Sequence, residues 1–388
     1  MNEQLIVKNF GPIKNATVDF KRVTVFIGPT GGGKSTLAKL AAVFREHKDI
    51  GNTLEHNKAF NDYSILDFTQ ENTSLEWLLN NNEGAQLPIT PPDSSDNEAI
   101  LNIPYSPSKG NFDDLRDILL KNNYTINDWE GVKQAVLETL KMQQRGNIPT
   151  TYITSNRTFI PAIEYSWAGL LRDDIGLPKD TLDFANGFFV CRREVIELEI
   201  PFLKVKYLHR SGQDFIKVPG VETLFRLYEA ASGIQSVTPL LVLLEHLSRN
   251  TEQAQSFIIE EPELNLYPTA QQGLLNWLVE KCTQGENDLT ITTHSPYILS
   301  HLNLLLYAHH VGNKDEEKRQ KVAAIIPEKY WVNPDEFAAY YVNGPEGAGG
   351  VRSLLDPETK LISQNELDAV SGIQADEFDQ LLDINSGF

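Results

Sequence analysis

Cysteine, basic residues and long apolar runs are all scarce in this chain. Two cysteines among 388 residues, Cys191 and Cys282, exclude a disulfide framework, and neither has zinc-ligand spacing around it, so we expect both to be small buried residues. No apolar run approaches the roughly 20 residues that cross a bilayer, and the N-terminus lacks the shape of a signal peptide. We therefore expect a cytoplasmic protein without membrane contact.

Charge of one sign predominates, because 34 Lys and Arg stand against 53 Asp and Glu, for a formal net charge of −19. A surface that coats nucleic acid indiscriminately needs clustered basic residues to neutralise phosphates, and this balance argues against one. A local basic groove, direct contact with DNA, or a partner that touches DNA stays open. Internal repeats and heptad runs are absent from the sequence as well.

Apolar residues make up 41% of the chain, which is enough for the core of one large α/β domain or two smaller ones. Residues 5–7 and 16–20 alternate like two antiparallel strands joined through Gly11 and Pro12. An apolar strand at 23–27 follows them.

Later segments predict a hairpin and a crossover. Residues 203–209 and 214–218 have the pattern of a hairpin, followed by a helix over 221–231. Strands at 256–259 and 289–292 flank a helix, which is the pattern of one right-handed crossover in a parallel sheet.

The middle of the chain has a different character. Residues 80–111 are rich in Asn, Pro and Ser and poor in periodicity, so they predict a long surface insertion. Helical patterns follow at 113–121 and 127–144, and then a β-rich run at 151–154.

Glycine gathers in one loop, where residues 28–35 read Gly-Pro-Thr-Gly-Gly-Gly-Lys-Ser between an apolar strand and a helical stretch. Backbone N–H groups of such a loop surround the β- and γ-phosphates of a nucleoside triphosphate, Lys34 adds a positive charge, and Ser35 offers a hydroxyl to Mg²⁺. The alternative is a glycine turn that binds no nucleotide. We expect the loop to be exposed and Lys34 to pack against nothing in the core. The expected nucleotide-binding residues are Gly28, Pro29, Thr30, Gly31, Gly32, Gly33, Lys34, Ser35 and Thr36.

Two carboxylates, Glu260 and Glu261, end the apolar strand that begins at 256. In an ATPase the first carboxylate at this place holds Mg²⁺, usually through water, and the second polarises the water that attacks the γ-phosphate. The alternative is a strand that simply ends in solvated charge, and the glycine-rich loop upstream favours the metal-and-base interpretation. Glu260 stands where most such proteins have Asp, and its additional methylene displaces the carboxylate.

Two further segments suggest anion binding. His294 follows the next apolar strand, so it should emerge at the same sheet edge as the glutamates and could sense the γ-phosphate; the alternative is a structural histidine. Residues 231–236, Ala-Ser-Gly-Ile-Gln-Ser, precede a helix that we expect to carry Pro239 in its first turn. Small polar residues at a helix start form an anion site, although they also form ordinary helix caps.

In this order the four segments resemble the motifs of an ABC-type ATPase head: Walker A at 28–35, a signature at 232–235, Walker B at 257–261 and a switch histidine at 294. Val-Lys-Asn-Phe-Gly-Pro-Ile at 7–13 and Glu-Glu-Pro-Glu-Leu-Asn-Leu-Tyr-Pro at 260–268 resemble the RecF, SMC and OLD-type branch more than transporter subunits. The resemblance implies ATP and Mg²⁺ as cofactors. It implies catalytic roles for Lys34, Glu261 and His294, nucleotide contacts from Ser232, Gly233 and Gln235, and metal contacts from Ser35 and Glu260.

The sequence departs from that pattern in two respects. Ile234 stands where most ABC signatures have a second glycine, and no long coiled coil separates the two Walker motifs. No TOPRIM-like acidic module is evident after His294, so a nuclease would be another chain. What remains resembles the compact ATPases of bacterial anti-phage systems of the Septu, PARIS and retron type. Gln70 is a candidate for the Q-loop glutamine, with an ordinary surface glutamine as the alternative.

The implied fold class is α/β: an ABC ATPase head with a parallel or mixed P-loop sheet, an N-terminal antiparallel β subdomain and a helical signature lobe. The implied assembly is a head-to-tail dimer or higher oligomer with shared ATP sites. We divide the chain into 1–79, the N-terminal part of the head with Walker A; 80–150, an insertion and helical segment; 151–309, with the signature, Walker B and the switch histidine; and 310–388, an acidic C-terminal extension.

The leading hypothesis is an ATPase whose nucleotide-gated dimer controls a separate effector, a nuclease, in anti-phage defence. The first alternative is a RecF-like or SMC-like DNA-repair clamp that acts directly on DNA. A transporter motor and a nucleotide-locked scaffold that barely hydrolyses ATP are two others. The acidic stretch at 376–382 could dock a partner through Phe378 and its leucines, or form a solvated C-terminal helix.

Overall fold

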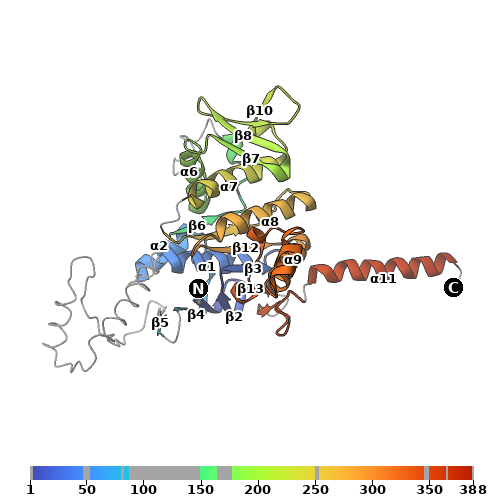
Figure 1. Cartoon of the computed structure of the whole chain (residues 1–388). Helices are drawn as coiled ribbons and strands as arrows, with labels where there is room; N and C mark the ends of the chain where they lie inside the picture. Colours follow the sequence, from blue (N-terminus) through green and yellow to red (C-terminus); the bar gives the residue numbers. More distant parts are fainter. Residues whose placement is uncertain are drawn as a thin grey trace, which may run out of the picture. The chain divides into compact units, whose positions relative to one another are not determined.

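The computed structural model describes residues 3–46, 53–79, 83–86, 149–163, 177–249, 253–344, 349–363 and 366–386. Contacts divide the chain into two units, residues 1–88 with 149–388, and residues 89–148. The helices expected at 113–121 and 127–144, and all of the expected insertion except 83–86, lie outside the described residues. Everything described below belongs to the first unit (Figure 1).

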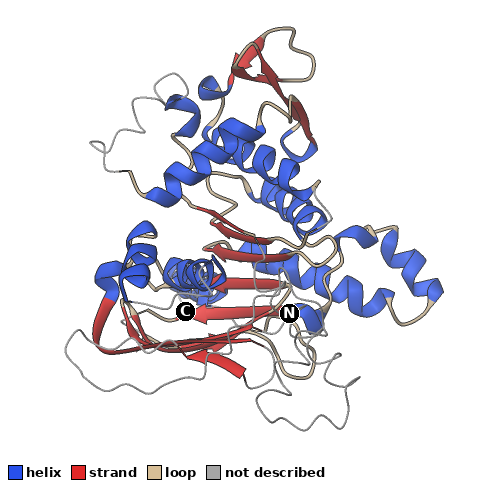
Figure 2. Cartoon of the chain, turned by 90° about the vertical axis from the view of Figure 1, so that its left-hand side faces the viewer, coloured by secondary structure: helices blue, strands red, loops and turns tan. Residues whose placement is uncertain are grey.

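A six-stranded sheet forms the centre of this unit, with the order β14-β13-β3-β12-β11-β6 (Figure 2). Neighbouring strands from β13 to β6 run parallel, and β14 pairs antiparallel with β13. Every residue of β3, β11 and β12 is buried, as expected for strands covered on both faces. In the order of the sheet, the strands are Val351–Ser353, Phe337–Val342, Val23–Ile27, Asp288–Thr293, Ser256–Glu260 and Thr150–Ile153.

Two antiparallel sheets accompany the central one. The first has the order β2-β1-β4-β5, and the predicted N-terminal strand pair is confirmed there. The second has the order β10-β9-β8-β7 and contains the predicted hairpin as β8 and β9. Their strands are Ile13–Phe20, Glu3–Phe10, Thr69–Leu79 and Glu83–Gln86, and then Leu224–Arg226, Gln213–Lys217, Val205–Arg210 and Glu197–Ile200.

Helices connect these strands and pack on them. The predicted crossover is confirmed, because α8 lies between the parallel strands β11 and β12 in the sequence. The expected α/β fold class, with a mixed P-loop sheet, an N-terminal antiparallel sheet and helices around them, is confirmed. The α-helices are α1 (Lys34–Glu46), α2 (Thr53–Asp62), α6 (Lys179–Cys191), α7 (Ser232–Ser248), α8 (Pro268–Cys282), α9 (Pro296–Gly312), α10 (Glu316–Ala323) and α11 (Glu366–Ser386).

Two helix predictions in the lobe around α7 are wrong. The expected helix over 221–231 is instead strand β10 and a short 3-10 turn, Leu227–Glu229, because Leu224–Arg226 pair with β9 and extend its sheet. The helix expected to carry Pro239 in its first turn begins at Ser232, seven residues before Pro239, so this proline lies inside the helix. Proline removes one backbone hydrogen bond there, but Val237, Thr238 and Pro239 are all buried, and this packing holds the helix together.

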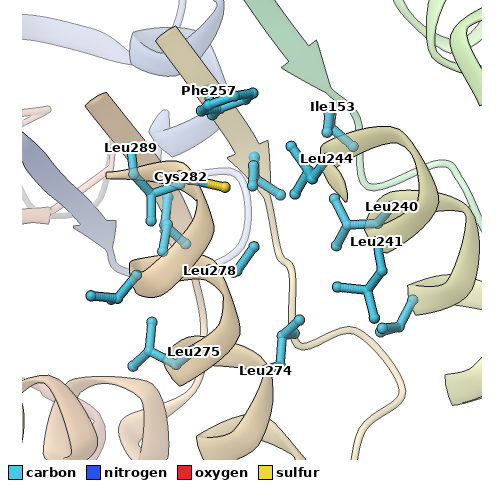
Figure 3. Packing of buried hydrophobic residues seen from close by; sticks show 14 of the residues in the cluster. Ile153, Leu240, Leu241, Leu244, Phe257, Leu274, Leu275, Leu278, Cys282 and Leu289 are labelled. Carbon is cyan, nitrogen blue, oxygen red and sulfur yellow. The ribbon is translucent and has the colours of Figure 1, made fainter. Parts of the chain in front are cut away.

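The main core lies between α7, α8 and the central sheet (Figure 3). Leucines of both helices meet Phe257 of β11 and Leu289 of β12. Cys282 lies in the same cluster, and Cys191 is also buried; neither forms a disulfide, as the sequence predicted.

A buried ion cluster ties α1 to two sheets. Arg45, only 3% exposed, bonds Glu3 of β1 at 2.7 Å and Asp288 of β12 at 2.9 Å. Its guanidinium also donates to the hydroxyl of Ser256 at 2.6 Å. Burial raises the pKa of Asp288 to about 6, although the Arg45 cation opposes that rise.

The substitution Arg45→Met is expected to cost about 3–5 kcal/mol of unfolding free energy at pH 7, because it removes the cation that pairs with two buried carboxylates. Without Arg45 the pKa of Asp288 rises further, so the folded variant keeps a proton that the unfolded chain releases. The loss should therefore be smaller at pH 5 than at pH 7 in urea unfolding. Arg319→Met, which breaks the exposed pair with Glu328, is the control and should have a much smaller effect. Equal losses in the two variants would contradict this account.

Candidate functional site

The loop at residues 28–35 joins β3 to α1 and depends on glycine at two points. Gly28 has φ +151°, and a Cβ there would lie 2.3 Å from the carbonyl oxygen of Val342. Gly33 has φ +106°, and its Cβ would lie 2.4 Å from Cδ1 of Ile13 on β2. The backbone of the loop lies so close to its neighbours at both positions that only glycine fits there.

The lysine of this loop is buried, whereas the tip of the loop is exposed. The tip from Pro29 to Gly31 is exposed, as predicted, but Lys34 is only 5% exposed, so the expected exposure of the loop does not extend to its lysine. Its Nζ donates to the carbonyls of Gly28 and Pro29, both at 2.9 Å. The loop thus wraps its own cation. Burial lowers the pKa of Lys34 to about 8, against the opposing pull of nearby glutamates led by Glu261.

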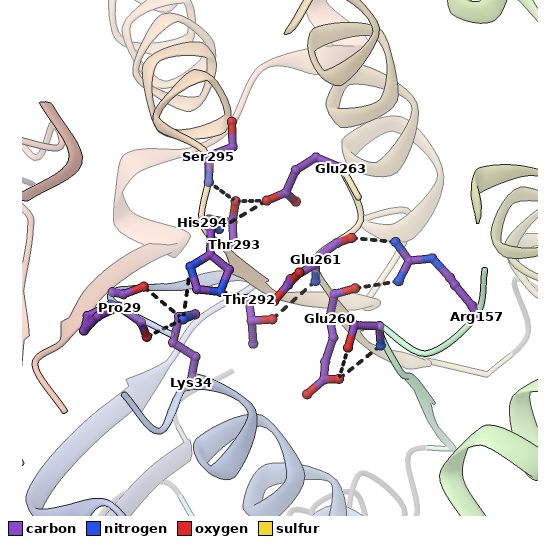
Figure 4. A network of polar contacts seen from close by, with 12 residues as sticks. Pro29, Lys34, Arg157, Glu260, Glu261, Glu263, Thr292, Thr293, His294 and Ser295 are labelled. Atoms are coloured by element: carbon purple, nitrogen blue, oxygen red, sulfur yellow. Dashed lines mark hydrogen bonds and ion pairs between the residues drawn. The ribbon is translucent and has the colours of Figure 1, made fainter. Parts of the chain in front are cut away.

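Lys34, His294 and Glu261 form one line of contacts (Figure 4). Nζ of Lys34 lies 3.5 Å from Nδ1 of His294, and Nε2 of the same ring lies 3.1 Å from Oε1 of Glu261. This geometry fits a neutral imidazole that accepts from the lysine and donates to the carboxylate. The hydrogen bond from His294 lowers the pKa of Glu261, so its carboxylate is ionised at neutral pH.

The backbone of Glu261 has an uncommon conformation. Its φ is +41°, in the left-handed region that non-glycine residues rarely adopt. Its N–H donates to the carbonyl of Thr292 on β12 at 2.9 Å. Such a conformation persists only where surrounding contacts impose it, and it is common at functional sites.

The side chain of Glu260 lies toward Ser155, which follows β6, whereas that of Glu261 lies toward His294, which follows β12. The Oε2 of Glu260 accepts from the backbone N–H of Ser155 at 3.1 Å, and the buried Tyr152 hydroxyl also interacts with this carboxylate. A buried carboxylate and the exposed Ser35 hydroxyl fit the few protein ligands that Mg²⁺ takes in nucleotide sites, where phosphates and water complete its shell. Within the described ranges no cluster of three or more His, Cys, Asp or Glu could hold a metal by itself.

Two residues that the sequence analysis did not single out hold this site together. Glu263 is 7% exposed, and its Oε1 accepts from the hydroxyl of Thr293 at 2.5 Å and from the N–H of His294 at 3.2 Å. Burial raises the pKa of its carboxyl group. The Glu-Pro-Glu phrase beginning at 261 could have signalled it. Arg157 is fully buried, and within the described part of the chain it donates to backbone carbonyls alone, a role that no local pattern reveals.

The signature segment lies at the start of α7, apart from the line of contacts at Lys34. Ser232 is exposed as its first residue. Gly233 packs so closely on the loop after the glutamates that a Cβ would lie 2.7 Å from the carbonyl oxygen of Asn265. The Gln235 amide donates to the carbonyls of Tyr228 at 2.9 Å and Ala230 at 2.7 Å. Gln235 is therefore engaged by its own chain.

The Q-loop candidate Gln70 lies at the start of β4 and bonds residues at the beginning of β2 and in the turn before it. Its amide donates to the carbonyl of Gly11 at 2.9 Å and accepts from Nζ of Lys14 at 3.2 Å. Both partners flank Ile13, which contacts Gly33.

A family model matches residues 1–166 and 189–299, and its description is AAA ATPase domain. The chain belongs to this family. The matched ranges contain the glycine-rich loop, both glutamates and His294, so ATP is the expected nucleotide and ATP hydrolysis is the general activity of the chain. No curated protein matches it.

Three solved structures similar to this ATPase are SMC head domains. One, from Thermotoga maritima, is 13% identical, with a TM-score of 0.36. A second, bound to the C-winged helix domain of ScpA, is 12% identical, with a TM-score of 0.36. A third, with an extended coiled coil and bound to the C-terminal domain of ScpA derived from Pyrococcus furiosus, is 13% identical, with a TM-score of 0.33. Each alignment covers 77% of this chain and 91% of the other.

Among the helices that the structure describes, none combines the length and the apolar character that crossing a membrane requires.

The lowered pKa of Lys34 predicts that ATP binding weakens in alkaline solution. Phosphates bind the protonated ammonium, which is lost as the pH rises through about 8. If the bound state stays fully protonated, the Kd for ATP should rise about tenfold between pH 7 and pH 9. Calorimetry in buffers of different ionisation enthalpy should show proton uptake at pH 9 and little at pH 7. Lys39→Met, which lies on the same helix as Lys34 and loses its ion pair with Asp180 of α6, should keep this dependence. A flat affinity without proton uptake would contradict the prediction.

Proposed function

We propose that this chain is an ATP-gated switch: two copies close over ATP, and hydrolysis opens them to control a separate effector. The catalytic part rests on the line of contacts from Lys34 through His294 to Glu261. In that line, His294 contacts both the cation that we expect to bind phosphate, Lys34, and the ionised carboxylate of Glu261. A change at either residue therefore reaches the histidine. This line supports hydrolysis rather than nucleotide binding alone.

Each polar group then has a role in hydrolysis. Glu261 polarises the attacking water, because its depressed pKa keeps the carboxylate ionised. His294 reports the γ-phosphate, because any anion that draws Lys34 away also frees Nδ1 of the ring. Mg²⁺, when bound, neutralises charge on the β- and γ-phosphates, and Ser35 and Glu260 are the residues that would hold it.

The exposed start of α7 supports a site shared between two copies. A helix N-terminus offers N–H groups to an anion, and Ser232 adds a hydroxyl there. The side chain of Lys34 bonds Gly28, Pro29 and His294 rather than Ser232. In ABC-type heads the signature of one copy covers ATP held by the other, and we propose that Ser232, Gly233 and the helix start act in this way. Gly233 packs on Asn265 of the loop between β11 and α8, and Tyr267 at the end of that loop is 76% exposed. Tyr267 would therefore lie near the junction.

Mixing two inactive variants tests the shared site. Lys34→Ala lacks a working phosphate loop and Ser232→Arg lacks a working signature, so each alone should be inactive. A symmetric dimer has two equivalent sites, so a 1:1 mixture with random exchange should recover about a quarter of wild-type ATPase activity. Activity is measured as steady-state phosphate release, and dimerisation as mass in solution. A monomer with saturating ATP, even with Glu261→Gln, or a mixture without recovered activity, would overturn the shared site.

The effector is the finer part of the proposal. The sequence has the ATPase motifs but neither a long coiled coil between them nor a recognisable nuclease module after His294. We propose that the effector is a nuclease encoded beside this chain and that the pair acts in anti-phage defence. Direct action on DNA is the competing function, and the net charge of −19 disfavours it.

Expression of the native operon under phage challenge tests this role. The wild-type operon should reduce plaque formation, the neighbouring gene product should co-purify, and Lys34→Ala should remove protection. An operon that gives no protection and yields this chain alone would contradict the defence role. ATP-dependent DNA binding by the isolated chain, with a steep salt dependence, would favour the DNA clamp instead.

A further inference from the structure

Arg157 connects the strand that carries the glutamates to the helix that carries the signature. It follows the edge strand β6 and is fully buried. Its guanidinium donates to four backbone carbonyls: Thr154 at 3.1 Å, Glu260 at 2.7 Å, Glu261 at 2.5 Å and Ser236 at 3.2 Å. Figure 4 shows Arg157 beside Glu260 and Glu261, opposite the side where Lys34 lies.

Two of these carbonyls, those of Glu261 and Ser236, belong to segments that we expect to act in hydrolysis. The carbonyl of Glu261 belongs to the residue with the left-handed backbone, so Arg157 holds that conformation from one side while Thr292 holds it from the other. The carbonyl of Ser236 lies at the end of the first turn of α7, four residues after Ser232. A planar, rigid guanidinium bridges the two.

The burial of this cation is costly, because none of its hydrogen bonds to the residues that the structure describes goes to a carboxylate. Burial lowers the pKa of Arg157 to about 10, so it still carries its charge at neutral pH. An apolar side chain of similar length would fill the same space without that desolvation cost, but it would not join α7 to Glu261.

We propose that Arg157 is a positioning residue that transmits the state of the Ser232 end of α7 to Glu261. If α7 shifts when Ser232 meets an anion, the guanidinium must move with Ser236 or lose that bond, and either change alters how the carbonyl of Glu261 is held. This inference rests on the proposed function, in which Ser232 meets the ATP of a second copy. Closure of the pair would thereby set the carboxylate for hydrolysis.

The test uses the full chain with Arg157→Lys, which keeps the charge but cannot reach all four carbonyls. We expect it to bind ATP within about threefold of wild type and to dimerise in the Glu261→Gln background, while kcat falls at least about tenfold with KM little changed. Because Arg157 acts through Glu261, the double variant should hydrolyse no more slowly than Glu261→Gln alone. Arg192→Lys, an ion pair with Asp214 elsewhere in the same lobe, is the matched control and should keep kcat.

Full kcat in Arg157→Lys, or additive losses in the double variant, would overturn the inference. Hydrogen exchange of the wild-type chain gives a second measurement that needs no substitution at 157. ATP should protect the backbone amides of Glu261 and Glu263, and Ser232→Arg should remove that protection while ATP still binds. If ATP fails to pair two copies at all, the proposed function fails. If the copies pair and the amides of Glu261 and Glu263 do not respond to Ser232→Arg, this inference alone fails.

Discussion

The parallel pairing of β3, β12 and β11 is the constraint on which the site depends. Because the three strands run in the same direction side by side, the chain leaves all of them at one edge of the sheet. The phosphate loop follows β3, the glutamates end β11, and His294 follows β12. Residues more than 200 positions apart in the sequence therefore come within hydrogen-bond range, as with Lys34 and His294 at 3.5 Å.

The site is held mainly through backbone groups. Lys34 is wrapped by carbonyls of its own loop, Glu263 accepts from the N–H of His294, and Arg157 donates to the carbonyls of both glutamates. Such contacts leave the side chains of Glu261 and His294 about one-third exposed, at 28% and 34%. Both side chains thus remain accessible while the backbone behind them is fixed.

Features carried by neighbouring residues were predictable. The glycine-rich loop, the paired glutamates after an apolar strand and the histidine after the next strand each have a local pattern, and the structure brings Lys34, Glu261 and His294 together as that order implied. The β8–β9 hairpin and the crossover through α8 were predictable for the same reason. Predictions failed where pairing partners decided the outcome, since residues 224–226 became a strand only because β9 offered an edge.

The amino-acid sequence by itself determined that this chain is a P-loop ATPase, because a glycine-rich loop with its lysine, between an apolar strand and a helix, is a local pattern of neighbouring residues. Only the tertiary structure decided how those groups are tuned. The burial that lowers the pKa of Lys34, the hydrogen bond that keeps Glu261 ionised and the four carbonyls around Arg157 all come from segments distant in the sequence. Burial and hydrogen bonding depend on what packs around a group in space, and local spacing contains no record of that.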